Sequence, residues 1–456
     1  MLATRCCPRF ASSRQFGFET WSSTPGTGPL QYGYEDIDVS LVGLPEEEDW
    51  IIQGPFLDGT LVQNVFTYNT ARATGMYAAR TRYCVLSIDG IFKGVYVLME
   101  KLKRGPDRID VSLNNASSDL SGGWIVKLDK GSNNFRTRQR TAFQFDYPAS
   151  TDITAAQDVY IRGYINDFEA ALMARSPNYA GWIDIDSFAH YLLLTELSIN
   201  RDGYRISMWF YKDKGGRLKA GPVWDYNLAY SAHSSFNPAA RTEWVYQGNL
   251  TGIPFWWSVL IEEQSFQQAV QSCWTAMRGS VLAVESVNAR IDGYVDVMGD
   301  LAIDADRDLW RTRNRHSQKI QSLKDEIADR LQWMDEQIAA LRPSWGVPSP
   351  PGTPTVPPTA SPSPLHLANA LLNSFSGCPA AEGQSYIMTA EDCALAAALV
   401  LGDGYRSVRV VRRTSKLPGC YWRPRLDDVT FNTGGSTTTS WGGRGASASK
   451  YSICLS

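Results

Sequence analysis

The sequence predicts an α+β protein, in which a β-rich half precedes a helix-rich half and a small cysteine-containing module follows. Three observations lead to this prediction. Residues 80–130 alternate apolar and polar positions between turn signals, which is typical of strands. From about residue 153 the apolar positions take helical spacing. A Pro/Ser/Thr-rich segment, Pro343–Pro364, then separates both halves from the C-terminal residues.

The strands of the first half are expected to form hairpins. Arg82–Asp89 and Phe92–Glu100 are joined by an Asp-Gly pair, which is a strong hairpin-turn signal. A second hairpin is expected where Met208–Lys212 and Leu218–Val223 flank a turn of Asp, Lys and two Gly. The remaining strand of this region is expected at Gly123–Asp129.

The helices are predicted from the spacing of apolar residues. Ile185–Leu197 places them on helical positions, and Asp186 is the expected N-cap. The chain after residue 262 reads as mostly helical. Its last helix, Ser317–Leu341, offers Glu326 and Arg330 as a charge pair four residues apart.

The chain is expected to contain two folded regions joined by a linker. Residues 1–342 form the large domain, residues 343–365 an extended linker, and residues 366–456 a small module. A module of this size usually needs covalent staples, so its four cysteines are expected to form two disulfides, with three possible connectivities. These cysteines are Cys378, Cys393, Cys420 and Cys454.

Composition excludes several classes of protein. The 456 residues hold 44 basic and 47 acidic side chains, so a net charge of -3 gives no electrostatic reason to expect nucleic acid as a partner. No apolar run is long enough for a transmembrane segment, and no zinc-site spacing occurs.

The cysteine module favours a secreted or cell-surface location. Because Met1–Phe10 lacks a signal-peptide core, we expect that the gene model is truncated at its start.

Two acidic residues in loops are candidates for chemistry. Asp202 follows the end of an apolar helix in Ser198–Ser207 (SINRDGYRIS), and Asp225 follows a strand in Gly221–Tyr230 (GPVWDYNLAY). In metal-dependent phosphoryl transfer one carboxylate orients the acceptor hydroxyl and a second holds Mg²⁺ on the phosphates. The structural alternative is that the first caps a turn and the second caps a helix, since Asp does both routinely.

The residues around these acids resemble the spore coat protein H (CotH) family over roughly residues 36–315. Five short motifs agree with the family in order and spacing: Ser40–Trp50 (SLVGLPEEEDW), Phe56–Asn64 (FLDGTLVQN), Gly94–Arg104 (GVYVLMEKLKR), Asn200–Asp202, and Val223–Asn227 (VWDYN). The resemblance implies an atypical, bilobal protein-kinase fold and a protein serine/threonine kinase that uses ATP with Mg²⁺ or Mn²⁺. It also implies a protein substrate with Ser or Thr acceptors, such as a surface or coat protein.

The resemblance also assigns roles to single residues. Asp202 matches the catalytic-loop aspartate and Asp225 the metal-binding aspartate. The Glu100 carboxylate matches the family's characteristic glutamate, which is expected near the phosphates or the metal and facing the same cleft as the two acids. The remaining assignments are Lys101 and Asn200 as cofactor-binding residues and Asn227 as a further metal ligand; for the lysine, a solvated surface role is the alternative.

Two departures from the pattern favour a different class of function. Ser207 stands where protein kinases place the Asn that holds a second metal ion. The segment Ala11–Trp21 (ASSRQFGFETW) keeps both ends of a family segment but lacks the lysines between them. The alternative function is a catalytically inactive surface adhesin or coat-scaffold protein with the same fold. A carbohydrate-binding protein is a third possibility, supported only by the fifteen Trp and twenty-one Tyr.

The predicted linker leads to a test of the domain organisation. Limited proteolysis should cut first between Pro343 and Leu365 and release a C-terminal fragment that stays folded without reductant, because exposed linkers without buried hydrogen bonds are cut first. Mass spectrometry should then find the four cysteines of the module paired only among themselves. A disulfide from this set into residues 1–342 would contradict the two-domain prediction.

Overall fold

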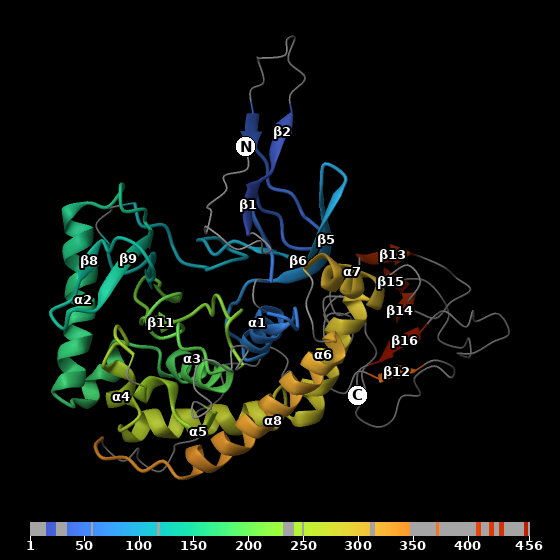
Figure 1. Ribbon diagram of the computed structural model, residues 1–456. Helices are drawn as coiled ribbons and strands as arrows, with labels where there is room; N and C mark the ends of the chain where they lie inside the picture. Colours follow the sequence, from blue (N-terminus) through green and yellow to red (C-terminus); the bar gives the residue numbers. More distant parts are fainter. Residues whose placement is uncertain are drawn as a thin grey trace. The chain divides into compact units, whose positions relative to one another are not determined.

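The computed structural model describes residues 15–23, 34–55, 58–115, 119–230, 241–248, 250–310 and 315–346, and the backbone of five strands beyond residue 370. The chain divides into two compact units, one of residues 1–38 with 47–350 and one of residues 39–46 with 351–456. The first unit combines helices with antiparallel sheets, so the predicted α+β class is confirmed (Figure 1).

The first sheet of this unit has four antiparallel strands in the order β1-β4-β6-β5. The long hairpin of the sheet confirms the first predicted hairpin. Its turn residues Asp89 and Gly90 have φ of 52° and 74°, the left-handed pair that a two-residue hairpin turn requires. The strands are β1 (Phe16–Glu19), β4 (Asp49–Gln53), β5 (Thr81–Ile88) and β6 (Ile91–Glu100). A separate two-stranded ribbon pairs β2 (Trp21–Ser23) with β3 (Tyr34–Asp36).

The second sheet of the unit has five strands in the order β11-β10-β7-β9-β8. Its centre is the predicted strand at residues 124–128, which pairs on one side with the second predicted hairpin. The strands are β7 (Trp124–Leu128), β8 (Phe135–Arg136), β9 (Ala142–Tyr147), β10 (Met208–Lys212) and β11 (Lys219–Ala220).

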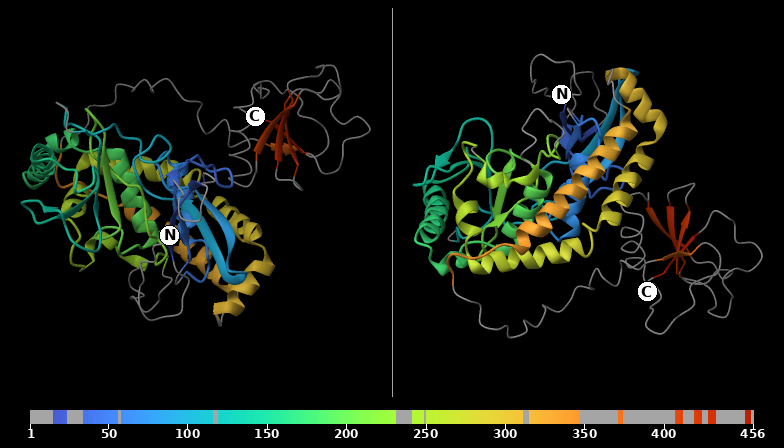
Figure 2. Two further views of the ribbon diagram at one scale, coloured as in Figure 1. Left: turned by 90° about the horizontal axis from the view of Figure 1, so that it is seen from above. Right: turned by 60° about the horizontal axis from the view of Figure 1, so that its bottom comes forward.

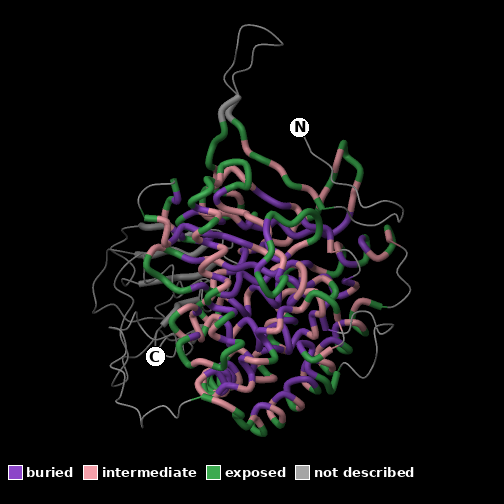
Figure 3. The backbone as a smooth tube through the Cα atoms, turned by 90° about the vertical axis from the view of Figure 1, so that its left-hand side faces the viewer, coloured by how far each residue is buried: buried purple, intermediate pink, exposed green. Residues whose placement is uncertain are grey.

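Helix α3 (Ile185–Ser198) lies at the centre of the helical part, against α1 (Gln63–Ala73), α5, α8 and β11. Every residue from Tyr191 to Ser198 is buried, so the second half of the helix is enclosed on all sides. The interior of the first unit as a whole is buried (Figure 3). The surrounding helices are α2 (Ala155–Met173), α4 (Trp256–Leu260), α5 (Gln264–Arg278), α6 (Val284–Met298), α7 (Asp300–Trp310) and α8 (His316–Ala339), with 3-10 turns at Pro177–Gly181 and Val245–Gln247.

The long helix α8 begins near the four-stranded sheet and runs toward the helical part, beside α6 and then α5 (Figure 2). Helix α7 packs on β6, where the Asp306 carboxylate accepts a hydrogen bond from the Val95 amide at 2.8 Å. The helices therefore connect both sheets into one unit. Within the part of the chain that the structure describes, none of the helices is long and apolar enough to cross a membrane.

Two local predictions were wrong. The N-cap of α3 is Asp184, whose carboxylate accepts the Ser187 amide at 2.9 Å, whereas Asp186 lies in the first turn. Arg330 does not pair with Glu326. Its guanidinium turns into the core because a buried carboxylate lies there, and the glutamate instead binds Arg241 at 2.8 Å.

The buried carboxylate that binds Arg330 belongs to Glu196 of α3. Both side chains are almost fully buried, and their charged atoms lie 3.2 Å apart. Glu196 also accepts hydrogen bonds from the amides of Val245 and Tyr246 and from the hydroxyl of Tyr204. Burial raises the pKa of Glu196 and lowers that of Arg330 to about 10, while each charge opposes the shift of the other.

The second unit contains a five-stranded sheet in the order β12-β16-β14-β15-β13. Within this sheet β14 and β15 are antiparallel neighbours. The strands are β12 (Leu371–Asn373), β13 (Ser407–Val411), β14 (Gly419–Arg423), β15 (Asp428–Asn432) and β16 (Tyr451–Cys454). Cys378 and Cys393 lie outside the described residues, so the disulfide pairing stays a prediction.

The predicted linker is described only at its start. Ser344 and Trp345 donate backbone hydrogen bonds to the Glu262 carbonyl, and the Trp345 indole packs on the core of the first unit. These residues are therefore part of the large unit. Residues 347–370 lie outside the described part of the chain, and the cleavage predicted for the linker should fall there rather than at 343–346.

Removing Glu196 should unfold the first unit far more readily than removing Glu326. Glu196→Ala leaves the buried Arg330 charge without its counter-charge, which costs about 3–5 kcal/mol. Glu326→Ala, on the surface of α8, removes a half-exposed ion pair worth at most about 1 kcal/mol. Urea denaturation of both variants measures the difference. Equal losses of unfolding free energy in the two variants would show that the buried ion pair stabilises the fold no more than the surface pair.

Candidate active site

Asp202 lies in the loop that joins α3 to β10, and Asp225 lies in the loop that follows β11. Helix α3 ends at Ser198, and Ile199 takes a left-handed backbone with φ of 53°. The chain then turns through Asp202 and enters β10 directly after Ser207. Asp225 follows β11 after a short extended segment. Helix, loop, hairpin and second acid therefore follow one another without any intervening element.

The side chain of Asn200 connects the two acid loops. Its carbonyl accepts a hydrogen bond from the Asp202 amide at 3.2 Å, and its amide group donates to the Asp225 carbonyl at 3.5 Å. The residue is 1% exposed. Asn200 was predicted to bind a cofactor, but its donor and acceptor contact the protein backbone. The side chain therefore connects the backbones of both acid loops, and its role toward a cofactor stays a prediction.

Gly203 allows this close packing of the Asp202 loop. A β-carbon at this position would lie 2.9 Å from the Thr195 side chain and 3.3–3.4 Å from the Asn200 carbonyl and side-chain amide. The Tyr191 hydroxyl, from α3, donates to the Gly203 carbonyl at 2.6 Å. The loop is therefore pressed against the helix that carries it.

Helix α1 holds the Asp225 loop from the other side. The Asp225 amide donates to the Tyr68 hydroxyl at 3.0 Å, and the Tyr226 amide donates to the Asn64 side chain at 2.6 Å. The start of α1 is fixed in turn by buried Asp58, whose carboxylate accepts the Gln63 amide at 2.9 Å. The motif Phe56–Asn64 thus supports the loop without offering an exposed acid.

Asp225 lies among charges that oppose one another. Burial and the negative charges of Asp202 and Asp129 raise the pKa of its carboxyl group. The positive charge of Lys130 and a side-chain hydrogen bond from Ser207 lower it, but the net shift is upward. A half-buried carboxylate beside two others favours a cation, since a positive ion relieves both the desolvation and the repulsion.

Ser207 brings a hydroxyl group to Asp225 through an unusual backbone. Its side chain hydrogen-bonds to the Asp225 carboxylate, and both residues have a left-handed φ, 60° for the serine and 61° for the aspartate. Ile199 and Tyr230 in the same two loops are also left-handed. Such residues cost about 1–3 kcal/mol each and concentrate at functional sites. Four of them in these two loops mark this place as more than a structural turn.

Asp202 is held by Arg205, one helical turn further on. A guanidinium nitrogen lies 2.6 Å from the Asp202 carboxylate, and the acid retains 25% of its side-chain exposure. Among the described residues, the second carboxylate oxygen of Asp202 has no protein hydrogen-bond donor. The side chain can therefore still accept a proton or a hydrogen bond from a bound molecule.

The Glu100 carboxylate is buried between two arginines, whereas Asp202 and Asp225 lie in partly exposed loops. Its side chain is fully buried and accepts from Arg80 and Arg108 guanidinium nitrogens at 2.6 Å each. The Tyr77 hydroxyl and the Arg80 amide bind its other oxygen at 3.1 and 2.9 Å. The expectation that this carboxylate faces the same cleft as the two acids was therefore wrong, because four donors already surround it.

The two remaining predicted residues differ in their surroundings. Lys101 is half-exposed and pairs with Asp49 at 2.6 Å, as the surface alternative expected. Asn227 is half-buried, two residues beyond Asp225. The acidic group of Asp38, Glu47 and Glu48 has ligand spacing, but the Lys103 ammonium lies 2.8 and 2.7 Å from the two glutamates and satisfies them.

The sequence analysis missed Arg80, Arg108, Tyr68 and Arg205. For Arg205 a local signal existed, since it follows Asp202 by three residues, a spacing at which helical side chains meet. Tyr68 contacts Asp225 across 157 residues, and Arg80 and Arg108 contact Glu100 from 20 and 8 residues away without a helical spacing, so the single sequence holds no comparable signal for these three.

The model of the CotH kinase protein family matches residues 31–334, which is about two thirds of the chain. The chain belongs to the CotH kinase family. A search of the curated proteins gives no match. Membership implies a kinase-like phosphotransferase, and the matched range contains every residue of the site described above. In this CotH-family chain the resemblance drawn from the five motifs is thereby confirmed.

The raised pKa of Asp225 leads to a stability test. The Asp225 carboxyl group binds its proton more tightly in the folded chain than in the unfolded chain, where its pKa is the ordinary 3.8. The contribution of this group to stability therefore falls as the pH rises from 3.8 through the raised folded-state pKa, and it is lost above that pKa. Asp225→Asn should accordingly raise the thermal midpoint at neutral pH in metal-free buffer, with the gain disappearing in acid.

The matched control is Asp292→Asn on α6, which removes an exposed acid paired with Lys324 and should bring no gain. Calorimetry at two pH values gives the comparison. A lower midpoint for Asp225→Asn at neutral pH would contradict the assigned electrostatics.

Proposed function

We propose that this CotH-family chain is an atypical protein serine/threonine kinase that transfers the γ-phosphate of ATP to protein hydroxyl groups with a divalent metal. The observation that carries the proposal is the joint placement of Asp202, Ser207 and Asp225. Protein kinases place a catalytic aspartate, a metal-binding residue five positions later, and a second acid that binds Mg²⁺. Here the same order runs through a loop, a hairpin and a second loop.

Asp202 has the surroundings of the residue that orients the acceptor hydroxyl. Arg205 fixes one carboxylate oxygen, and the Asn200 carbonyl fixes the Asp202 backbone. The free oxygen would accept the hydrogen bond of the acceptor hydroxyl and take its proton as the new O–P bond forms. Holding the hydroxyl in one position supplies much of the rate gain in phosphoryl transfer, where covalent catalysis plays little part.

Asp225 and Ser207 fit a hard divalent cation, which prefers oxygen ligands. Their oxygens already meet through a hydrogen bond, and Asn227 lies two residues away. When bound, Mg²⁺ or Mn²⁺ would offset phosphate charge at this place. Ser207 is a neutral ligand, as is the asparagine that kinases use there, so the substitution changes the ligand's reach and not its charge.

The nucleotide side of the proposal rests on Arg80. Of Arg80 and its partner Glu100, only the arginine could contact a phosphate, because its side chain is 27% exposed while the glutamate is fully buried. Arg108 beside it has two guanidinium nitrogens, Nε and Nη2, without a hydrogen-bond partner in the described chain. One carboxylate with two guanidinium groups leaves a surplus positive charge, which suits an anionic ligand.

The alternative function is a surface adhesin or coat-scaffold protein without catalysis. It is favoured by Ser207 in place of asparagine and by the lysines missing from Ala11–Trp21. A secreted or surface location fits both functions, and so do surface or coat proteins as partners. ATP binding with a divalent cation separates them, because the scaffold has no use for nucleotide.

The kinase proposal is tested by transfer of labelled phosphate from ATP to a serine-containing peptide, with Mg²⁺ or Mn²⁺. Asp202→Asn and Asp225→Asn should each lower kcat by about 10²-fold or more, because each carboxylate acts in the transition state. Asp292→Asn on α6 is the control and should retain full activity. An unchanged rate for Asp225→Asn would refute the mechanism, and absence of metal-dependent ATP binding would establish the scaffold alternative.

Arg80 gives a second, separate readout. Arg80→Met should raise the KM for ATP with a smaller change in kcat, since it removes a phosphate contact that is made before and during transfer. Arg82→Met, two residues further along the same strand region, is the comparison. Equal ATP affinity in Arg80→Met and the natural chain would remove this arginine from the nucleotide site.

A further inference from the structure

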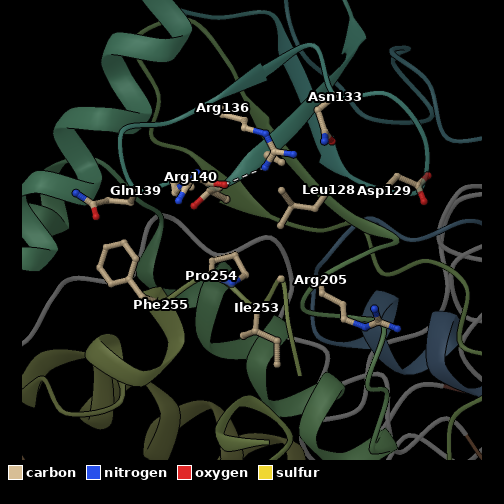
Figure 4. Close-up of a pocket in the computed structure, with 13 residues that line it drawn as sticks. Leu128, Asp129, Asn133, Arg136, Gln139, Arg140, Arg205, Ile253, Pro254 and Phe255 are labelled. Atoms are coloured by element: carbon tan, nitrogen blue, oxygen red, sulfur yellow. Dashed lines mark hydrogen bonds between the residues drawn. The ribbon is translucent and has the colours of Figure 1, made fainter. Parts of the chain in front are cut away.

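A cleft of about 410 Å³ lies beside the candidate active site (Figure 4). One wall comes from the end of β7 and the β8–β9 hairpin, and the other from residues 252–255. Arg205, the partner of Asp202, lines the same cleft, and so does Asp129, whose charge raises the pKa of Asp225. The cleft is therefore continuous with the residues that surround both acids.

The charged side chains that line the cleft are mainly cationic. Arg136, Arg140 and Arg205 face a single acid, Asp129. Arg205 is engaged with Asp202, but Arg136 and Arg140 form no ion pair with any described carboxylate; the former donates only a long hydrogen bond, 3.4 Å, to the Arg140 carbonyl. Two guanidinium groups thus remain uncompensated in one depression.

Two further features distinguish this cleft from an ordinary basic surface. The Nε atom of Arg205 is buried and has no hydrogen-bond partner among the described residues. The opposite wall, Ile253, Pro254 and Phe255, is apolar (Figure 4). An apolar wall lowers the local dielectric constant and strengthens the attraction of the arginines for an anion. Arginine forks match phosphate and carboxylate groups through paired hydrogen bonds.

We propose that this cleft binds an anionic side chain of the polypeptide substrate, phosphoserine or glutamate, a few residues from the acceptor serine. This rests on the proposed kinase function. The acceptor hydroxyl meets Asp202, so the chain of the substrate next to it passes Arg205 and reaches Arg136 and Arg140. The protein then selects serines that stand near acidic or already phosphorylated residues.

The nucleotide is the other possible source of an anion. The cleft favours the substrate, because its walls come from the β8–β9 hairpin and residues 252–255, whereas Arg80 and Glu100 belong to the region of the four-stranded sheet. Kinetics separates the two sources, since loss of a nucleotide contact changes the KM for ATP and loss of a substrate contact changes the KM for the peptide.

The experiment compares peptides with one acceptor serine in which a single neighbouring position carries phosphoserine, glutamate, alanine or lysine in turn. For the natural chain, phosphoserine at one or two positions should lower the peptide KM about tenfold relative to alanine, with a smaller gain for glutamate and a loss for lysine. In Arg136→Gln/Arg140→Gln this preference should disappear, while kcat on the alanine peptide and the KM for ATP stay unchanged.

The matched control is Arg138→Gln. Arg138 lies between the two arginines in the same hairpin and is exposed, but it does not line the cleft. It should keep the full preference. Equal KM values for all peptides in the natural chain, or a preference that survives in the double variant, would overturn the proposal. A change in the KM for ATP with an unchanged peptide preference would assign the cleft to the nucleotide and overturn it as well.

A binding measurement keeps this result separate from catalysis. Fluorescence anisotropy of a labelled phosphoserine peptide with Asp225→Asn, without ATP, should show binding that the added Arg136→Gln/Arg140→Gln changes weaken about tenfold. If the natural chain transfers no phosphate, binding of the peptide that depends on these arginines would support the cleft while refuting the kinase. Active transfer without any such binding would refute the cleft alone.

Discussion

The last turn of α3 determines the geometry of the whole site. Its buried Glu196 is neutralised by Arg330 from α8, and the Arg330 Nε also donates to the Glu196 carbonyl at 2.9 Å. The same turn accepts the Asn200 amide at Thr195 and the Tyr230 amide at Ser198. Both acid loops are therefore hydrogen-bonded to one helical turn, and the long-range ion pair between Glu196 and Arg330 holds this turn in the core. A shift of this turn would displace both acids together.

Local signals in the sequence were sufficient for most elements. The β5–β6 hairpin follows from an Asp-Gly pair between alternating strands, and α3 from its apolar spacing. The prediction erred where a residue had a distant partner. Arg330 is four residues from Glu326 but binds Glu196, 134 residues away, because a buried charge finds its compensation wherever the fold provides it. Such a partner leaves no local pattern in one sequence.

The candidate site could be predicted in part. Two acids in loops were found from their motifs, and the structure places them in one charged neighbourhood. Their supports were not foreseen, since Tyr68 and Asn64 come from a helix more than 150 residues earlier. Glu100 shows the opposite case. Its motif identified the residue, but Glu100 forms ion pairs with two arginines from different segments. Its carboxylate would therefore affect a ligand only by positioning Arg80.

The left-handed backbone at Asp225 has an evolutionary consequence. Asparagine adopts this conformation as readily as aspartate, and a single nucleotide change converts one codon into the other. The fold therefore sets no barrier against loss of the charge at this position, and only selection for the chemistry retains it. A lineage released from that selection keeps a rigid, well-packed domain available for adhesion or scaffolding. Catalysts and non-catalytic descendants of this architecture can thus lie one mutation apart.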